Sequence, residues 1–176
     1  TFFENQAFLD AAVHVRENNG TFHIVGLFST GSVHAYVDHL FALLEFTKRE
    51  NIERVAIHIF GDGRDSPARE LKTFLPQLEE RLRSGYANAF VASIIGRHFS
   101  MDREERWSLT AQTYDCLIGK QGATFDNPKR YIDASYSAGV TDEFLVPAWC
   151  IDEKGEARGR IKEGDAVVFF NFREDS

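Results

Sequence analysis

A strand-and-turn stretch in the middle of the chain constrains the fold more than any other feature. Residues Val55–Phe60 form an apolar run interrupted by one histidine, which indicates a buried strand. Gly61 and Gly63 follow at once and allow backbone angles that a side chain would forbid, so the strand leads into a tight turn. Arg64 and Asp65 then lie at the carboxyl end of a strand, where open α/β sheets bind their ligands. This pair suits a small anionic ligand with hydroxyl groups, although a surface ion pair in a loop has the same pattern.

Similar apolar runs alternate with segments of helical periodicity along the chain. Strands are expected at residues 22–28, 55–60, 89–95 and 166–170, and helices at residues 2–18, 35–50, 67–84, 103–118 and 129–137. Ser66 and Pro67 favour a helix start directly after the central turn, and Pro76 should bend or interrupt that helix. Asp102 with Glu105 forms a capping-box pattern that predicts the start of the fourth helix.

The last third of the chain has a different pattern. Residues 119–128 are expected to form a polar loop, while 143–151 and 157–161 are expected to pair as a hairpin around a turn at 152–155. No internal repeat or linker interrupts the sequence, so residues 1–176 are expected to form one domain. Three strand–helix units, a hairpin and a final buried strand predict an α/β fold. The expected architecture is a three-layer α/β/α sandwich with a mostly parallel, mixed sheet and a β-hairpin near the C-terminus.

Composition narrows the class of partner. The chain has 176 residues, enough for one domain that buries roughly 70% of its unfolded surface. Its net charge of −7 argues against nucleic acid or an anionic membrane as the main partner. Cys116 and Cys150 are far apart in the sequence and are expected to be reduced core thiols of a cytoplasmic protein. We find no apolar run of membrane-spanning length and no signal-peptide pattern, and the ends of the chain suggest a piece of a longer protein.

Basic side chains follow each of the predicted buried strands. They are His34, Arg64, Arg97 and Arg173, and Arg103 comes shortly after Arg97. If the strands are parallel, these groups converge on one edge of the sheet. In an acidic protein, such a cluster indicates a focused positive site for a phosphate or a carboxylate, which the planar guanidinium fork pairs with well. Chance clustering of exposed charges at strand ends is the alternative.

No other motif in the sequence identifies a specific cofactor, metal or catalytic group. The turn after Phe60 resembles a dinucleotide-binding glycine loop but lacks the third glycine. His34 and Asp38 would share a helix face, but two ligands do not make a metal site, so no metal is expected on this chain. His58 lies inside an apolar strand and is interpreted as a core histidine with satisfied hydrogen bonds. No serine has an evident base partner, so a nucleophilic triad is not supported.

Five motifs, in order along nearly the whole chain, resemble the cofactor-independent phosphoglycerate mutases. They are Gly26-Leu27-Phe28-Ser29-Thr30-Gly31-Ser32-Val33-His34, Asp62-Gly63-Arg64-Asp65, Gly96-Arg97-His98-Phe99-Ser100-Met101-Asp102-Arg103, Gly139-Val140-Thr141-Asp142-Glu143-Phe144 and Phe169-Phe170-Asn171-Phe172-Arg173. The chain is similar to the inserted substrate-binding, phosphotransferase domain of that family. It lacks the alkaline-phosphatase-like metal domain that flanks this domain on both sides in the family.

The resemblance implies a function for the full-length protein. Such enzymes interconvert 3-phosphoglycerate and 2-phosphoglycerate in glycolysis, without a requirement for 2,3-bisphosphoglycerate. The reaction proceeds through a phosphoserine and two manganese ions, all carried by the metal domain. The chain alone is therefore expected to bind no manganese and to show no mutase turnover. The alternatives are a stand-alone domain that binds anions or phosphorylated metabolites without catalysis, and a related phosphomutase or phosphatase with another substrate.

The same resemblance implies roles for individual residues. His34 would lie by the transferring phosphate or the glycerate hydroxyls, and Arg64 and Asp65 would hold the glycerate. Asp65 would be placed to accept or donate the hydroxyl proton, as a candidate catalytic residue. Arg97 and Arg103 would bind the carboxylate side of the ligand, and Arg173 would face its phosphate.

Four positions depart from the family pattern, and one of them is Gly61, which replaces a larger apolar residue. Thr30 and Ser32 stand where the family usually has aspartate and glycine, so the loop after the first strand could differ in shape or charge. Ser176 replaces an arginine that the family carries three positions after Arg173. This replacement would weaken the phosphate clamp, or it reflects only where the chain ends.

Overall fold

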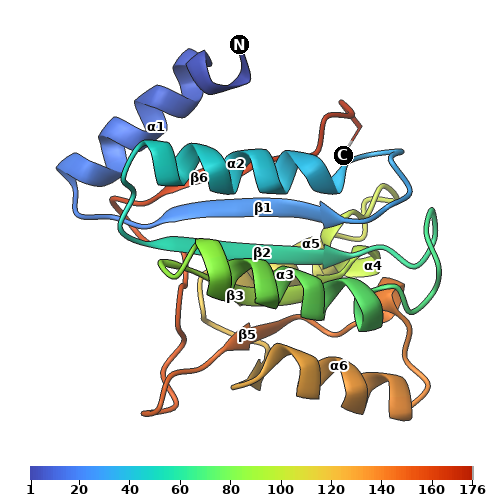
Figure 1. Ribbon diagram of the computed structural model, residues 1–176. Coiled ribbons are helices and arrows are strands. Elements are labelled where there is room, and N and C mark those ends of the chain that lie inside the picture. The colour runs from blue at the N-terminus through green and yellow to red at the C-terminus, as the bar shows by residue number, and fades with distance from the viewer. Residues whose placement is uncertain (176) are drawn as a thin grey trace.

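A six-stranded sheet runs through the molecule in the computed structural model, which describes residues 1–175 (Figure 1). The strands are β1 (Phe22–Phe28), β2 (Val55–Gly61), β3 (Ala89–Gly96), β4 (Ala123–Phe125), β5 (Ala148–Cys150) and β6 (Ala166–Phe169). Their order in the sheet is β4-β5-β3-β2-β1-β6. β1 pairs in parallel with β2 and β6, β2 with β3 and β4 with β5, whereas β3 and β5 are antiparallel. The predicted mixed, mostly parallel sheet is confirmed.

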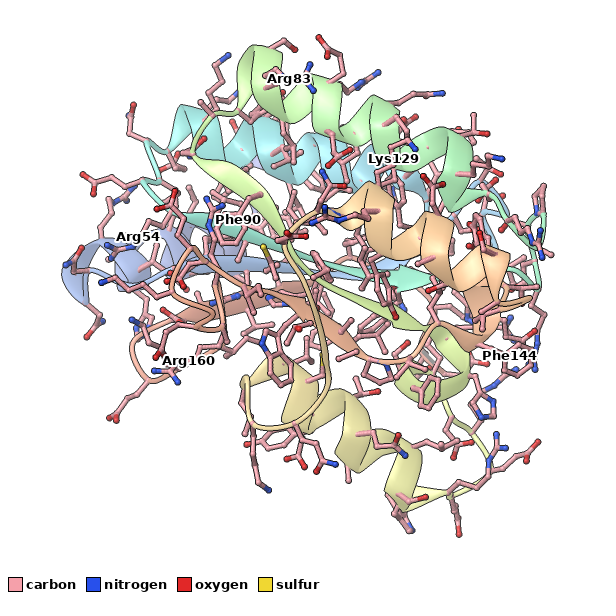
Figure 2. The ribbon with its side chains drawn as sticks, turned by 90° about the horizontal axis from the view of Figure 1, so that it is seen from below. Arg54, Arg83, Phe90, Lys129, Phe144 and Arg160 are labelled. Atoms are coloured by element: carbon pink, nitrogen blue, oxygen red, sulfur yellow. The ribbon has the colours of Figure 1, made fainter. Side chains whose placement is uncertain are left out.

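Helices cover both faces of this sheet. They are α1 (Gln6–Glu17), α2 (Val37–Arg49), α3 (Leu71–Gly85), α4 (Arg97–Ser100), α5 (Trp107–Leu117) and α6 (Pro128–Ser137), with short 3-10 helices η1 (Phe2–Glu4) and η2 (Asp142–Phe144). α2, α3 and α6 lie on one face and α5 lies on the other, as Figures 1 and 2 show together. α1 packs beside the edge strand β6. The predicted three-layer α/β/α sandwich is therefore confirmed.

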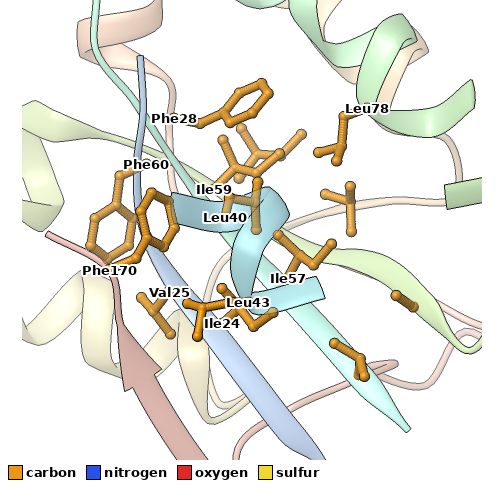
Figure 3. Packing of buried hydrophobic residues seen from close by; sticks show 14 of the residues in the cluster. Ile24, Val25, Phe28, Leu40, Leu43, Ile57, Ile59, Phe60, Leu78 and Phe170 are labelled. Carbon is orange, nitrogen blue, oxygen red and sulfur yellow. The ribbon is translucent and has the colours of Figure 1, made fainter. Parts of the chain in front are cut away.

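The core lies between the sheet and the α2–α3 layer. Every residue of β1 and β2 is buried, as their apolar runs predicted. Ile24 and Ile57 on these strands pack with Leu40 and Leu43 of α2 and Leu78 of α3 (Figure 3). Burial of each such side chain contributes about 1.5–3 kcal/mol, so this contact fixes the strands that carry the loops at the carboxyl edge.

The start of α3 corrects one prediction. The helix begins at Leu71 and not after Ser66, whose hydroxyl is buried without a hydrogen-bond partner. The backbone N–H of Leu71 donates instead to the carboxylate of Asp142, 71 residues away, at 3.1 Å. A remote side chain therefore performs the capping that a local serine was expected to perform. Pro76 lies inside the helix, which continues as one element to Gly85.

The start of α5 corrects a second prediction. Asp102 accepts hydrogen bonds from the backbone N–H groups of Glu104 and Arg106, at 3.3 and 2.7 Å, and so closes a turn before the helix. Glu105 has a left-handed φ of 59°, which is incompatible with the first turn of a helix, and α5 begins at Trp107. The capping-box prediction was therefore wrong, and the short helix α4 occupies the start of the expected loop.

The segment predicted as a strand over residues 143–151 is only partly extended. It begins as η2, which lies across the ends of β2 and β3, and becomes β5 at Ala148. Glycines make this crossing possible: a Cβ at Gly61 would lie 2.7 Å from the Asp142 carbonyl oxygen, and one at Gly96 would lie 2.6 Å from the Leu145 nitrogen. Gly96 N–H also donates to the Leu145 carbonyl at 2.8 Å.

Two further differences concern the sheet edge. The expected hairpin is present only as a single antiparallel bridge between Ile151 and Ala157. The residues that follow pack against β3, with the Arg158 guanidinium over the Phe90 ring and Gly159 close to Phe90 and Ala92. The expected polar loop at 119–128 contains β4, a short edge strand that its polar composition did not indicate. No helix within residues 1–175 is long and apolar enough to cross a membrane.

Candidate functional site

The carboxyl ends of β1, β2, β3 and β6 form one edge of the sheet, and the basic residues predicted from the sequence converge there. The loop after β1 carries His34, the turn after β2 carries Arg64 and Asp65, and α4 begins at Arg97. The segment after β6 passes beside the loop that follows β1, where the N–H of Phe172 donates to the His34 carbonyl at 2.9 Å. The predicted convergence follows from the parallel strands.

Asp62, a residue not singled out from the sequence, lies at the centre of this edge. Its buried carboxylate accepts the N–H groups of Arg64 and Asp65 at 3.2 and 3.0 Å, which fixes the turn after β2. The Ser29 hydroxyl donates to its second oxygen and joins the loop after β1. Burial alone would raise the pKa of Asp62, but the hydrogen bonds from Ser29, Asp65 and Arg97 outweigh burial and lower it. Asp62 is therefore an anion in the folded protein.

Arg97 is held inside the protein by two carboxylates. Its side chain is 4% exposed, and its Nη1 lies 2.6 Å from both Asp62 Oδ1 and Asp65 Oδ2. Removing one partner of a buried pair costs about 3–5 kcal/mol, because the charge that remains has lost its solvent. This arginine is therefore fixed in place, and it orients Asp65 toward the edge of the sheet.

His34 lies next to Asp65, with its ring almost completely buried. Its Nε2 is 3.7 Å from Asp65 Oδ2, and its Nδ1 is 3.7 Å from Asp175 Oδ1. Burial lowers the pKa of His34, and the nearby charges of Arg97 and Arg173 lower it further. The ring is consequently neutral at neutral pH, so it can donate a hydrogen bond from one nitrogen and accept one at the other.

The other three arginines are about half exposed, and each is paired. Arg64 Nη2 lies 2.7 Å from Glu143 Oε1. Arg103 Nη1 and Arg173 Nε each lie 2.8 Å from Asp175, one at either carboxylate oxygen. Exposed pairs of this kind contribute only about 0–1 kcal/mol each, so these arginines are far easier to release than Arg97.

A small polar pocket of about 80 Å³ opens beside Arg64, Arg97 and Arg103, whereas His34, Asp65 and Arg173 do not line it. Its lining residues are Arg64, Arg97, His98, Met101, Asp102, Arg103, Glu104, Arg106 and Glu143. A larger crevice of about 270 Å³ lies at the opposite end of the sheet, beside Arg16 and Arg54. Two arginines line that crevice, whereas Arg64, Arg97, Arg103 and Arg106 all line the polar pocket, so the polar pocket is the better candidate for an anionic ligand.

Sequence reasoning missed the carboxylates that organise this edge, namely Asp62, Glu143 and Asp175. Asp62 had a local signal, since it lies between two glycines of the turn that carries Arg64 and Asp65. Glu143 and Asp175 gave no such signal, because each meets its arginine only through the packing of η2 and of the segment after β6.

The two departures in the loop after β1 have different structural consequences. The Thr30 hydroxyl donates to Glu70, and the Thr30 N–H donates to the same carboxylate at 3.2 Å. Ser32 has a left-handed φ of 47°, a conformation that glycine adopts without strain and serine does not. Ser176 lies outside the described residues.

His58 belongs to the core and not to this edge. Its Nδ1 lies 2.8 Å from Ser93 Oγ and its Nε2 lies 2.8 Å from His23 Nδ1, while His23 Nε2 lies 3.0 Å from Asp165. The interpretation of His58 as a satisfied core histidine is confirmed. Within residues 1–175, no three His, Cys, Asp or Glu side chains lie close enough to hold a metal ion.

Comparisons with known proteins agree with this architecture. The family model described as the BPG-independent PGAM N-terminus matches residues 1–176. The chain is 45% identical to the 2,3-bisphosphoglycerate-independent phosphoglycerate mutase of Moorella thermoacetica and 44% identical to that of Thermomicrobium roseum, over 99% of its length in both cases. It covers 34% and 33% of these relatives, so the chain spans about a third of their length.

A solved structure shares the fold. The phosphoglycerate mutase of Leishmania mexicana, crystallised at low cobalt concentration, superimposes with a TM-score of 0.86 at 28% identity. The match covers 96% of this chain and 32% of that one. With the family model matching its whole length, the chain belongs to the BPG-independent phosphoglycerate mutase N-terminus family.

Proposed function

We propose that this chain is the substrate-binding domain of a phosphoglycerate mutase that interconverts 3-phosphoglycerate and 2-phosphoglycerate in glycolysis. One observation carries the proposal: a chain of this family gathers His34, Asp65 and four arginines at the carboxyl edge of its sheet. A phosphoglycerate has two anionic groups and a hydroxyl, which matches separate arginines placed around one carboxylate and one imidazole.

The geometry suggests how the residues would divide the work. Arg64, Arg103 and Arg173 have accessible guanidinium groups and would pair with the carboxylate and the phosphate of the ligand. Asp65, held by Arg97, would accept or donate the proton of the reacting hydroxyl. The neutral His34 ring beside it would donate a hydrogen bond to a phosphate or hydroxyl oxygen.

The nucleophile and the metal ions would come from the rest of a longer protein. We infer a phosphoserine and two manganese ions there from the resemblance to the cofactor-independent phosphoglycerate mutases, and the greater length of the relatives, about three times that of this chain, leaves room for such a domain. That covalently linked metal domain would be the partner of this one. A cytoplasmic location is supported by two buried free cysteines, because such thiols persist in a reducing compartment.

The proposal is tested by amide NMR titration of the chain with 3-phosphoglycerate, with sulfate as the control for a generic anion. Each charged hydrogen bond contributes about 1.5–3 kcal/mol, against a cost of at least ~4 kcal/mol for immobilising the ligand. With part of the site missing, we expect millimolar affinity, with shifts confined to the loops that hold His34, Arg64, Asp65, Arg97, Arg103 and Arg173.

Two variants sharpen this experiment. Arg64→Ala should abolish the saturable shifts, whereas Arg130→Ala, which removes an exposed arginine paired with Asp126 on the α6 side, should leave them unchanged. Equal shifts with sulfate would contradict a phosphoglycerate site and leave an anion-binding domain. Robust manganese-dependent mutase turnover by this chain alone would contradict its assignment as a binding domain only.

A further inference from the structure

Three basic groups from distant parts of the chain converge on one carboxylate, that of Asp175. Arg103 precedes α5 and reaches its Oδ2 at 2.8 Å, while Arg173 follows β6 and reaches its Oδ1 at 2.8 Å. His34, from the loop after β1, places Nδ1 3.7 Å from Oδ1. The segment after β6 thus ends beside the carboxyl end of β1, where Figure 1 shows it. The Asp175 carboxylate thus lies where these three groups meet.

Burial separates this cluster from the other arginine–carboxylate pairs of the edge. The side chains of Arg103, Arg173 and Asp175 are 47%, 46% and 37% exposed. The Arg97 side chain is 4% exposed and its partner Asp62 is 1% exposed. A buried pair resists separation because each ion has lost its solvent, whereas a solvated pair can exchange one partner for another at little cost. Arg97 is therefore a fixed part of the site, and Arg103 and Arg173 are exchangeable.

The position of Asp175 also suits a phosphoryl group. Its Oδ2 accepts a hydrogen bond from Arg103, its Oδ1 forms an ion pair with Arg173, and the His34 imidazole faces the same carboxylate. A phosphate monoester offers three terminal oxygens and about −1.5 to −2 charges, against two oxygens and one charge for a carboxylate. It would therefore satisfy the same three groups better than Asp175 does.

We propose that Asp175 is an internal counter-ion that occupies a phosphate subsite formed by His34, Arg103 and Arg173, and that it leaves this subsite when a phosphorylated ligand binds. Arg103 is thereby assigned to the phosphate and not to the carboxylate side that the family resemblance implied. The identity of that ligand as a phosphoglycerate rests on the proposed function, whereas the exchange itself requires only a phosphate dianion. Asp175 thus sets the affinity of the subsite, because every phosphate that binds has to replace its two ion pairs.

The competing explanation is that Asp175 braces the two arginines in a productive position, and the two explanations predict opposite signs. If Asp175 competes with the ligand, removal of its charge strengthens phosphate binding. If Asp175 is a brace, its removal releases Arg103 and Arg173 and weakens phosphate binding. Asp175→Asn keeps the size of the side chain and removes the charge, so it decides between them.

The experiment is an amide NMR titration of the chain with inorganic phosphate at fixed ionic strength and pH 7.5. We expect Asp175→Asn to bind phosphate about three- to tenfold more tightly than the unmodified chain, with the largest shifts in the loops of His34, Arg103 and Arg173. Asp133→Asn makes the same charge change at an exposed pair with Lys129 and controls for net charge. Asp175→Glu retains the charge and should bind no more tightly than the unmodified chain.

Unchanged or weaker binding by Asp175→Asn would overturn the proposal, and so would an equal gain in Asp133→Asn. The amide spectrum itself reports whether each variant is folded, and Asp175→Ala repeats the test if the asparagine variant is not. A parallel titration with 3-phosphoglycerate separates this inference from the proposed function. Tighter phosphate binding by Asp175→Asn, with no preference for 3-phosphoglycerate over phosphate, would support the exchange and refute the phosphoglycerate assignment.

Discussion

Asp142 gives the sharpest stability prediction, because its carboxylate is buried and also caps a helix. Its oxygens accept hydrogen bonds from Leu71 N–H, at the start of α3, and from the Tyr136 hydroxyl. Burial, with a smaller contribution from the nearby charge of Glu70, raises the pKa of Asp142 from 3.8 to about 6 despite these bonds. The folded protein therefore binds a proton at Asp142 more tightly than the unfolded chain does.

The sign of the pH dependence follows from this raised pKa. The stabilising contribution of protonated Asp142 is fully present below pH 3.8 and is lost as the pH rises through about 6. A difference of about two pKa units corresponds to roughly 3 kcal/mol of unfolding free energy. In Asp142→Asn, the amide oxygen can accept from Leu71 and the amide nitrogen can donate to Tyr136, so the cap is retained without the charge.

The assay is urea unfolding of both proteins between pH 4 and pH 8. We expect the unfolding free energy of Asp142→Asn to rise relative to that of the unmodified chain by roughly 3 kcal/mol across this range, with most of the change between pH 4.5 and 6.5 (~1.36 kcal/mol per pKa unit). Asp133→Asn, at an exposed pair, reports the effect of net charge alone. Parallel pH profiles for Asp142→Asn and the unmodified chain would refute the reasoning.

Two further predictions concern the buried charges and histidines. Arg97→Met should lower the unfolding free energy by about 3–5 kcal/mol in urea titrations, because it leaves the buried Asp62 without its cation and also removes the partner of the partly exposed Asp65. Arg103→Met should cost at most about 1 kcal/mol, and equal effects would contradict the division into fixed and exchangeable arginines. Burial lowers the pKa of both His23 and His58, so their neutral rings contribute stability above pH 6.5 that is lost as the pH falls through their lower folded values. Nitrogen-15 NMR at pH 7 should find both rings neutral, with the proton on Nε2. His23 would then donate from Nε2 to Asp165, and His58 would donate from Nε2 to Nδ1 of His23. A proton on Nδ1 of either ring would contradict this chain of hydrogen bonds.

The sequence alone predicted the features that depend on the local residue pattern and on the parallel arrangement of the strands. The apolar runs of β1 and β2 identified buried strands because both faces of a central parallel strand are covered. Once those strands were expected to be parallel, the convergence of His34, Arg64 and Arg97 followed from topology alone. These predictions required no knowledge of any individual contact.

The sequence alone did not predict the features that depend on contacts between distant segments. The start of α3 is set by Asp142, and the strand expected over 143–151 is replaced at its beginning by η2, because Gly61 and Gly96 let another backbone approach. Nothing near Ser66 in the sequence indicates that a residue in η2 caps the helix. Local signals for helix starts and strand lengths therefore failed where tertiary contacts supplied a competing partner.

The pairing of each arginine with a carboxylate explains how an acidic protein can maintain a cationic edge. The protein has a net charge of −7, and each of the four arginines at this edge is paired with a carboxylate. One of these arginines is buried and the others are about half exposed. The buried Asp62 and the partly exposed Asp65 hold the buried Arg97, while Glu143 and Asp175 pair with arginines that solvent still reaches. An anionic ligand that enters such a site replaces a carboxylate instead of meeting an unpaired charge. The net gain per ion pair is then small, so tight and specific binding requires further contacts to the ligand from outside this domain.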